Sequence, residues 1–336
     1  MSTIKILGLD LGKSTFHLIG LDASGHEQLR HKFTRSKLIE FLANFEPTLI
    51  AMEACSGAHW LARQCQSLGH QVKLIPPQYV KPYVKTNKND YIDAAAIAEA
   101  ATRGNMRFVS VKSETAQIIN SIHRIRTGYV RERTACMSRI GAVLLEFGLS
   151  LPKGHSAMKK LFFWLAKQPY ELPKSLMQEL IEYHEHYQYL NQQIQNQDTK
   201  IKQTVTANSN AQLLKTIPGV GDQTASQCLA SVQATDFNNG RHMAAWLGLV
   251  PHQHSTGGKS KLLGISKRGN KALRTLFIHG ARAMLSKPES AERAFGEWVI
   301  KLKERKPYNV AVVALANKLA RIAWSVLDKQ QPFKMA

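Results

Sequence analysis

The sequence predicts an α/β layer at the N-terminus, followed by two mainly helical regions. Short apolar runs alternate with helical patterns over the first hundred residues, and apolar steps of three and four residues take over from about Glu114. The last third mixes glycine-rich turns with helices. A chain of 336 residues is long enough for two or three domains. We place the three regions at residues 1–155, 156–206 and 207–336.

The first region begins with three strands. Residues 4–9 form an apolar strand that ends in Asp10, and residues 15–21 and 27–33 follow it across short turns as antiparallel partners. The alternation then continues with a helix over 36–45, a strand over 48–52, a helix over 58–68 and a strand over 71–75. This order is typical of a layered α/β domain.

The middle of the chain predicts two long helices. Apolar residues from Ile118 to Phe147 recur at helical spacing and indicate one amphipathic helix. A second series from Leu176 to Ile201 follows heptad steps and predicts a coiled coil, although its end at residues 191–198 is rich in Gln and Asn. The partner helix comes from this chain or from another copy.

Composition restricts the class of protein. Lys and Arg number 45 against 24 Asp and Glu, and this excess of +21 indicates a polyanionic partner such as nucleic acid. The mean hydropathy of -0.25 and the absence of an apolar run of about 20 residues argue against a membrane protein. Without a signal-peptide pattern, we expect a cytoplasmic protein. Four scattered cysteines lack metal-ligand spacing and are expected to be buried thiols.

Four carboxylates stand out by position. Asp10 and Glu53 end two apolar strands, and Asp90 and Asp93 open a helix that runs to Ala101 and lie three residues apart on one face. If the strands are neighbours, all four converge, and converging carboxylates repel one another unless a cation such as Mg²⁺ lies between them. A pair of such ions suits phosphoryl transfer. The alternative is that each acid is a cap or turn residue, with Asp90 as an N-cap.

These acids lie in segments that resemble a known family. Residues 6–10 (ILGLD), 52–54 (MEA) and 87–94 (NKNDYIDA) are similar to the RNase H-like, RuvC-type domain of the DEDD transposases. Those enzymes form the insertion-sequence one-ten family, which includes the pilin-gene invertases. The resemblance implies an RNase H-like fold for the first region. It also implies that Asp10, Glu53, Asp90 and Asp93 bind Mg²⁺.

A second group of residues surrounds Ser255. This serine lies in a glycine-rich loop whose backbone N–H groups and cations suit a phosphate. Judged from the residues alone, a phosphate-binding loop is favoured over a nucleophilic serine. The residues expected to contact nucleic acid here are Gly257, Gly258, Lys259, Lys261, Lys267, Arg268 and Arg274.

The same loop resembles the signature of the family's C-terminal transposase domain, and the resemblance reverses that preference. It implies that Ser255 attacks the DNA backbone and becomes covalently joined to it, with Ser260 and Ser266 as weaker candidates. It further implies an enzyme that cuts and rejoins donor and target DNA. The implied partners are a structured bridge RNA and further copies of the chain, from dimer to tetramer.

Other segments are candidate nucleic-acid contacts. Residues 217–225 are similar to a helix-hairpin-helix element in which Gly219 and Gly221 expose N–H groups to a phosphate, or they form only a tight turn between helices. The remaining candidates, each of which could instead be a solvated basic side chain, are Lys81, Lys85 and Lys88 beside Tyr79 and Tyr83, then Arg124 and Arg131, and finally the group Lys306, Asn309, Lys318 and Arg321.

The leading hypothesis is therefore a DNA recombinase of an insertion sequence, working at the nucleoid. A RuvC-like nuclease that uses water, a pilin-type DNA invertase and an inactive nucleic-acid-binding scaffold are the alternatives. A sugar-kinase or actin-like ATPase shares the pattern of residues 8–12 (GLDLG), but no later glycine-rich nucleotide-binding segment follows a strand.

Overall fold

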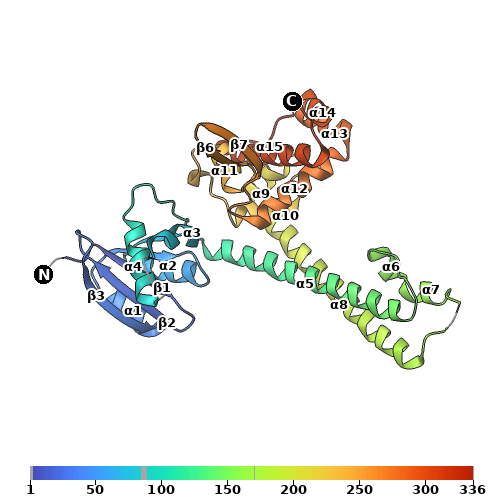
Figure 1. Cartoon of the computed structure of the whole chain (residues 1–336), viewed down its shortest axis with the longest axis horizontal. Helices are drawn as coiled ribbons and strands as arrows, with labels where there is room; N and C mark the ends of the chain where they lie inside the picture. Colours follow the sequence, from blue (N-terminus) through green and yellow to red (C-terminus); the bar gives the residue numbers. More distant parts are fainter. Residues whose placement is uncertain (1–2, 85–88, 170, 336) are drawn as a thin grey trace. The chain divides into compact units, whose positions relative to one another are not determined.

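The computed structural model describes residues 3–84, 89–169 and 171–335, so Lys85 and Lys88 lie outside the described residues. The chain divides into two compact units, Met1–Thr115 and Ala116–Ala336 (Figure 1). The sequence-based boundaries at 155 and 206 follow changes of motif, whereas this division follows the packing. The long helix that begins at Glu114 thus contributes almost all of its residues to the second unit.

The first unit is built on a mixed five-stranded sheet in the order β3-β2-β1-β4-β5. The first three strands form the predicted antiparallel meander, and β4 and β5 add to it in parallel. Buried side chains alternate between the two faces. The strands are β1 (Ile6–Leu11), β2 (Thr15–Leu21), β3 (Glu27–Thr34), β4 (Leu49–Glu53) and β5 (Gln71–Ile75).

Helices cover both faces of this sheet. One face packs against α1 (Arg35–Ala43) and α2 (Ala58–Ser67), and the other packs against α4 (Asp90–Ala101). Two short turns of helix, α3 (Pro77–Val80) and η1 (Lys81–Tyr83), precede α4. The predicted α/β layer is therefore confirmed, with element ends that differ from the predicted ones by a few residues.

Helix α4 lies directly against strand β1. A Cβ atom added to Gly8 would collide with the carbonyl oxygen of Ala94 and would lie 2.7 Å from the Cβ of Ala98. Only a residue without a side chain allows the helix backbone to come so close to the strand. Because Ala94 follows Asp93 directly, this contact fixes the first turn of α4 over the carboxyl end of β1.

The two predicted long helices are α5 (Glu114–Glu146) and α8 (Lys174–Thr206), and they pack on each other in antiparallel fashion. Arg126 contacts Asp198 and Arg133 contacts Asn191, while the thiol of Cys136 donates to the carbonyl oxygen of Tyr183. The coiled-coil partner thus comes from this chain. The Gln/Asn-rich end of α8 pairs with arginines. Two short helices, α6 (His155–Lys159) and α7 (Leu161–Leu165), pack on the apolar end of the pair.

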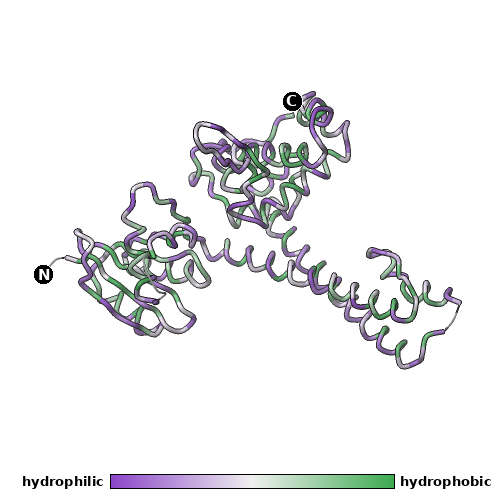
Figure 2. Tube along the Cα trace, in the orientation of Figure 1, coloured by the Kyte–Doolittle hydropathy of each residue, from purple (hydrophilic) through white to green (hydrophobic). Residues whose placement is uncertain are grey.

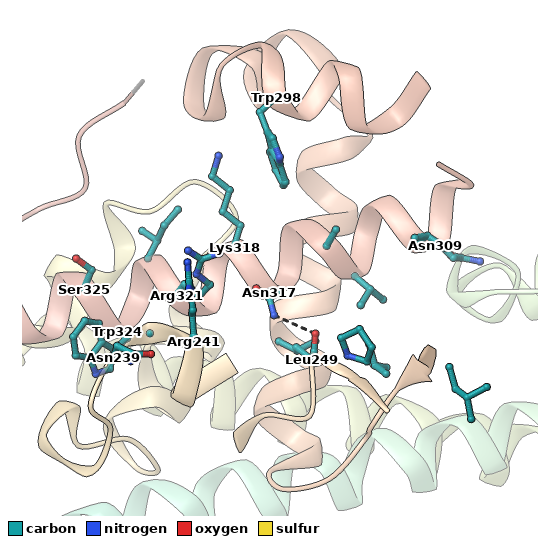
Figure 3. A pocket seen from close by; sticks show the side chains of 18 residues that line it. Asn239, Arg241, Leu249, Trp298, Asn309, Asn317, Lys318, Arg321, Trp324 and Ser325 are labelled. Atoms are coloured by element: carbon teal, nitrogen blue, oxygen red, sulfur yellow. Dashed lines mark hydrogen bonds between the residues drawn. The ribbon is translucent and has the colours of Figure 1, made fainter. Parts of the chain in front are cut away.

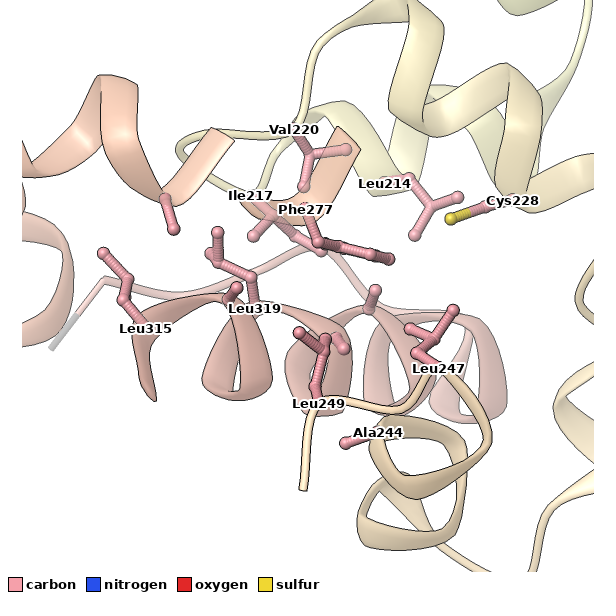
Figure 4. Packing of buried hydrophobic residues seen from close by; sticks show 14 of the residues in the cluster. Leu214, Ile217, Val220, Cys228, Ala244, Leu247, Leu249, Phe277, Leu315 and Leu319 are labelled. Carbon is pink, nitrogen blue, oxygen red and sulfur yellow. The ribbon is translucent and has the colours of Figure 1, made fainter. Parts of the chain in front are cut away.

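The remaining elements form a mainly helical C-terminal part with one hairpin. Phe277 lies at its centre, among Leu214, Val220 and Leu319 (Figure 4), and apolar residues gather toward its interior (Figure 2). The elements are α9 (Ser209–Lys215), α10 (Asp222–Leu229), η2 (Ala234–Asp236), α11 (Gly240–Trp246), β6 (Pro251–Thr256), β7 (Lys259–Ile265), α12 (Lys271–Leu285), α13 (Pro288–Phe295), α14 (Glu297–Arg305) and α15 (Tyr308–Lys329).

Helix α15 is the one described helix with the length and composition of a membrane span, with a mean hydropathy of 1.6 over an 18-residue window. The expectation that no apolar run approaches that length is wrong for this segment. Half of the window is buried inside the protein, and residues such as Leu315 and Leu319 belong to the C-terminal core. The core helix of a globular protein has the same composition.

The contact at Gly8 gives a first prediction. We expect Gly8→Ala to lower the free energy of unfolding by about 1–3 kcal/mol, because the added methyl group must push α4 away from β1. The matched control is Gly104→Ala in the same unit, where no atom lies within 4 Å of the added Cβ. Urea unfolding followed by circular dichroism measures both variants. A Gly8 variant as stable as the control would contradict the tight contact.

Candidate active site

Asp10 and Glu53 lie at one edge of the sheet, as the sequence predicts. Strands β1 and β4 are parallel neighbours with Leu9 opposite Met52, so the next residue of each strand is the acid. Burial raises the pKa of the Cys55 thiol, and the charges of Glu53 and then Asp10 raise it further. Both carboxylates are therefore close enough to act on the same thiol.

Asp90 and Asp93 occupy the first turn of α4. The N-cap of this helix is Asn89, whose side-chain oxygen accepts a hydrogen bond from the backbone N–H of Tyr91 at 2.9 Å. The interpretation of Asp90 as the cap is therefore wrong. Its side chain is 60% exposed and is free of the capping role. Three-residue spacing puts Asp90 and Asp93 on the same helix face.

A histidine outside the predicted set of acids joins this group. His17 pairs directly with Asp10 across the β1–β2 hairpin, and its Nδ1 lies 3.4 Å from Oδ2 of Asp90. The candidate ligand atoms of Asp10, His17 and Asp90 lie within 4.8 Å of one another. The strand register could have revealed this residue, because counting back from the turn between β1 and β2 puts His17 opposite Asp10.

Negative charge is concentrated in this cluster. Burial raises the pKa of Asp10 above its usual range, and the nearby charges of Asp93 and Asp90 raise it further, while His17 acts in the opposite direction. A bound divalent cation would remove this repulsion and would accept the oxygen and nitrogen ligands present. The cluster therefore fits a divalent metal held by Asp10 and Asp90, with His17, Glu53 and Asp93 adjacent.

Ser255 lies on an exposed hairpin. The segment is not the loop that its glycines predict: residues 251–265 form two antiparallel strands, β6 and β7, joined by Gly257 and Gly258. Both glycines have positive φ, 54° and 76°, which a two-residue hairpin turn requires. The Ser255 hydroxyl is exposed, faces Ser260 across the hairpin, and accepts a hydrogen bond of 2.8 Å from Nε2 of Gln253.

The base of this hairpin is held rigidly. A Cβ at Gly248 would collide with the carbonyl oxygen of Arg268, and one at Gly269 with that of Trp246, so the two backbones touch. The guanidinium of Arg274 donates to the carbonyl oxygens of Leu247 and Arg268 at 2.9 and 2.8 Å. The structure thus differs from the prediction for Arg274. It is a buried anchor, 7% exposed, and its hydrogen bonds leave it poorly placed to contact a phosphate.

The other predicted contacts divide into exposed cations and packed glycines. Gly219 has a φ of 91°, and a Cβ added to Gly280 would lie 2.0 Å from the carbonyl oxygen of Gly219, which supports the tight-turn alternative. Gly221 is exposed. Arg126 and Arg133 are hydrogen-bonded to side chains of α8.

The region around the serine hairpin is basic, since the sequence carries no acidic side chain between Asp236 and Glu289. The exposed cations are Lys81, Arg124, Arg131, Lys259, Lys261, Lys267 and Arg268.

Comparisons with known proteins match the two parts of the chain that carry these residues. Residues 7–148 match a family model described as Transposase, of the DEDD type, and residues 211–296 match the model described as Transposase IS116/IS110/IS902 family. The transposase for insertion sequence element IS1328 of Yersinia enterocolitica is 44% identical over 99% of each chain. The chain belongs to this transposase family.

More distant relatives cover nearly all of this transposase. The transposase for insertion sequence element IS1111A of Coxiella burnetii is 40% identical over 99% of this chain and 92% of that protein. The pilin gene-inverting protein of Moraxella lacunata is 23% identical over 97% of each chain. The transposase is thus an enzyme that cuts and rejoins DNA. Its DEDD domain implies an RNase H-like fold, with which the mixed sheet of the first unit is consistent.

The contrast between Arg274 and Arg268 gives a second prediction. We expect Arg274→Met to lower the free energy of unfolding by about 2–4 kcal/mol, because two buried carbonyl oxygens lose a charged donor. Arg268→Gln should change stability by less than about 0.5 kcal/mol, since the side chain is exposed, and should weaken DNA binding. Urea unfolding and a DNA-binding titration separate the two effects. Equal stability of the two variants would contradict the anchoring role.

Proposed function

We propose that this transposase is the recombinase of an insertion sequence, in which Ser255 forms a covalent bond to DNA and the acids Asp10, Glu53, Asp90 and Asp93 bind Mg²⁺. The observation that carries the proposal is the convergence of Asp10 and Asp90 with His17 at the edge of the sheet. The exposed hydroxyl of Ser255 on a cation-rich hairpin supports its role as nucleophile.

The acids and His17 divide the work of holding a metal. The candidate ligand atoms of Asp10 and Asp90 lie within 4.8 Å of one another, and the charges of Asp93 and Asp90, which raise the pKa of Asp10, would attract a cation that stabilises its charged form. Mg²⁺ bound there would polarise an oxygen of the scissile phosphate. His17 orients Asp90 through their 3.4 Å contact.

In the proposed cleavage step the Oγ of Ser255 attacks phosphorus. The Ser255 Oγ–P bond forms, the P–O bond to one sugar breaks, the serine proton passes to a base, and the leaving sugar oxygen takes up a proton. Rejoining reverses these changes with a sugar hydroxyl as the nucleophile. The energy of the broken phosphodiester bond is kept in the bond between Ser255 and the phosphate, so the cycle needs no ATP. Lys259 and Lys261 lie near Ser255 on the hairpin and would stabilise charge on the phosphate.

The proposal includes a guide RNA and an oligomer. A structured bridge RNA would pair with donor and target DNA, and dimers to tetramers would bring acids and serine together from different copies. The net charge of +21 supports binding of both DNA and RNA, because Lys and Arg side chains neutralise phosphate groups. Exposed Arg124 and Arg131 on α5 offer contacts for phosphate groups. We place this activity at the nucleoid, in the cytoplasm.

The role of Ser255 gives a third prediction. Ser255→Ala should abolish the covalent protein–DNA adduct and lower cleavage by about three orders of magnitude or more, while DNA binding stays unchanged because the side chain is exposed. Ser260→Ala, across the hairpin, is the matched control and should retain the adduct. Denaturing gels of a labelled DNA substrate measure both. Free ends without an adduct in the unaltered chain would support the alternative, a RuvC-like nuclease that uses water.

The carboxylate cluster gives a fourth prediction. A raised folded-state pKa means that charged Asp10 destabilises the folded protein at pH values above its unfolded pKa, and the penalty falls as the carboxyl takes up a proton at lower pH. Asp10→Asn should therefore raise thermal stability at pH 7 without metal, yet abolish Mg²⁺-dependent cleavage. Mg²⁺ should raise the melting temperature of the unaltered protein but not that of the Asp10→Asn variant.

The control for this experiment is Glu40→Gln, an exposed acid on α1 that pairs with Lys37. It should leave cleavage and the Mg²⁺ effect on melting unchanged. Full cleavage in the presence of a chelator would reject the metal role.

Inversion of a DNA segment is a second candidate for the natural task. The similarity to the pilin gene-inverting protein over 97% of each chain supports this candidate. Both tasks use the same cleavage and rejoining, so the orientation of the recombination sites beside the gene separates them. Insertion-sequence ends support transposition, and a segment found in both orientations supports inversion.

A further inference from the structure

A large cavity adjoins the base of the serine hairpin. It has a volume of about 1120 Å³ and lies between β6–β7, the start of α11, and helices α14 and α15 (Figure 3). Pro251, Leu263 and Ile265 of the hairpin form part of its wall. All of these residues belong to the second unit.

The walls of the cavity are apolar and aromatic. Val313, Ala314 and Ile322 of α15 line it, with Trp298 and Trp324 at its sides. The indole N–H of Trp324 donates to the carbonyl oxygen of Ala234 at 3.1 Å, which fixes that ring. A flat aromatic ring beside apolar residues suits a nucleobase, because every base can stack on such a ring.

Cations and amides complete the lining. Arg241, Lys318 and Arg321 line the cavity together with asparagines 239, 309 and 317, and no acidic residue is among its described lining residues. The ammonium of Lys318 lies 4.1 Å from the ring centroid of Trp298, so cation and ring present one combined surface. Arg241 and Arg321 are exposed and can approach a phosphate. A ligand with a flat ring and a negative charge matches this set.

We propose that this cavity binds one unpaired nucleotide of the DNA strand that the transposase cuts, with the base beside Trp298 and its phosphate on Arg241 and Arg321. The assignment rests on the proposed role of Ser255. Ser255 is four residues from Pro251 along β6, about 13 Å at the usual rise of a strand. A nucleotide in the cavity thus lies near the cut phosphate. Base flipping or strand opening would supply it.

A hydrogen bond joins the lining of the cavity to the start of the serine hairpin within this unit. Asn317, which lines the cavity, also donates from Nδ2 to the carbonyl oxygen of Leu249 at 3.2 Å, just before β6. The helix that forms the floor therefore holds the strand that carries Ser255. Asn317 thus contributes both to the lining of the cavity and to the position of the hairpin base.

The test uses the full-length protein and short labelled oligonucleotides of one sequence. Arg321→Gln and Trp298→Leu should each weaken binding of single-stranded DNA by about tenfold, which is within the range for loss of one stacked base, and should weaken binding of the matching duplex by less than about twofold. Arg305→Gln, an exposed cation of α14 outside the cavity, is the control and should change neither. Fluorescence anisotropy measures each affinity.

A second readout guards against misfolding of the Trp298→Leu variant. Trp298→Phe keeps a ring for stacking and should retain most of the affinity, but the quenching of tryptophan fluorescence by single-stranded DNA should largely disappear. Unchanged quenching in this variant would overturn the proposed position of the base. Equal losses for single-stranded and duplex DNA would show only a general basic surface, and tighter binding of single-stranded RNA through the same residues would overturn the assignment to the DNA strand.

Ser255→Ala separates this proposal from the proposed function. If that variant still forms the adduct while the cavity variants lose single-stranded binding, Ser255 is not the nucleophile: the cavity still binds an unpaired nucleotide, and only its position beside the cut phosphate is overturned. If adduct formation depends on Ser255 but the cavity variants bind normally, the cavity assignment fails alone.

Discussion

Direct contact between backbones, made possible by glycine, holds the candidate catalytic residues of both units. In the first unit Gly8 lets α4 rest on β1, and this contact carries Asp90 and Asp93 to the strand end where Asp10 lies. In the second unit Gly248 and Gly269 let the two ends of the hairpin segment touch. Such contacts leave no space for a side chain to adjust, so the positions of the functional groups follow from the path of the backbone.

This arrangement costs free energy in both units. In the first unit like charges lie close together, and in the second unit carbonyl oxygens are taken out of water. Asp10 is half-buried beside two further carboxylates, and burial and then the charges of Asp93 and Asp90 raise its pKa. The carbonyl oxygens of Leu247 and Arg268 are brought inward, and the buried guanidinium of Arg274 satisfies both. In the first unit the exposed Asp90 lies beside the half-buried Asp10. In the second unit the exposed hairpin of Ser255 is held at its base by the buried Arg274. Sites that perform chemistry commonly hold such locally unfavourable features.

Much of the fold was predictable because it depends on apolar periodicity. The sheet, the position of Asp10 and Glu53 at its edge, and the helix that starts at Asp90 all follow from local patterns. Local patterns do not reveal His17, because its position beside Asp10 depends on strand register. They also do not show that Arg274 is buried, because the sequence beside a glycine-rich segment is the same for a buried and an exposed basic residue. The glycine-rich segment around Ser255 suggests a loop, but Gly257-Gly258 is also a sequence typical of a two-residue hairpin turn. The cavity depends on the packing of distant helices, which no local pattern encodes.

The antiparallel pairing of α5 and α8 also constrains how the length of this protein can change. Each helix has 33 residues, about 50 Å at the usual helical rise, and the contacts Arg126–Asp198 and Arg133–Asn191 match positions along both. Residues added to one arm alone would shift every later pair out of step. Insertions that survive must therefore occur in both arms together, or at the tip between residues 146 and 174. Relatives of different length should therefore differ at the tip, or by equal numbers of residues in both helices.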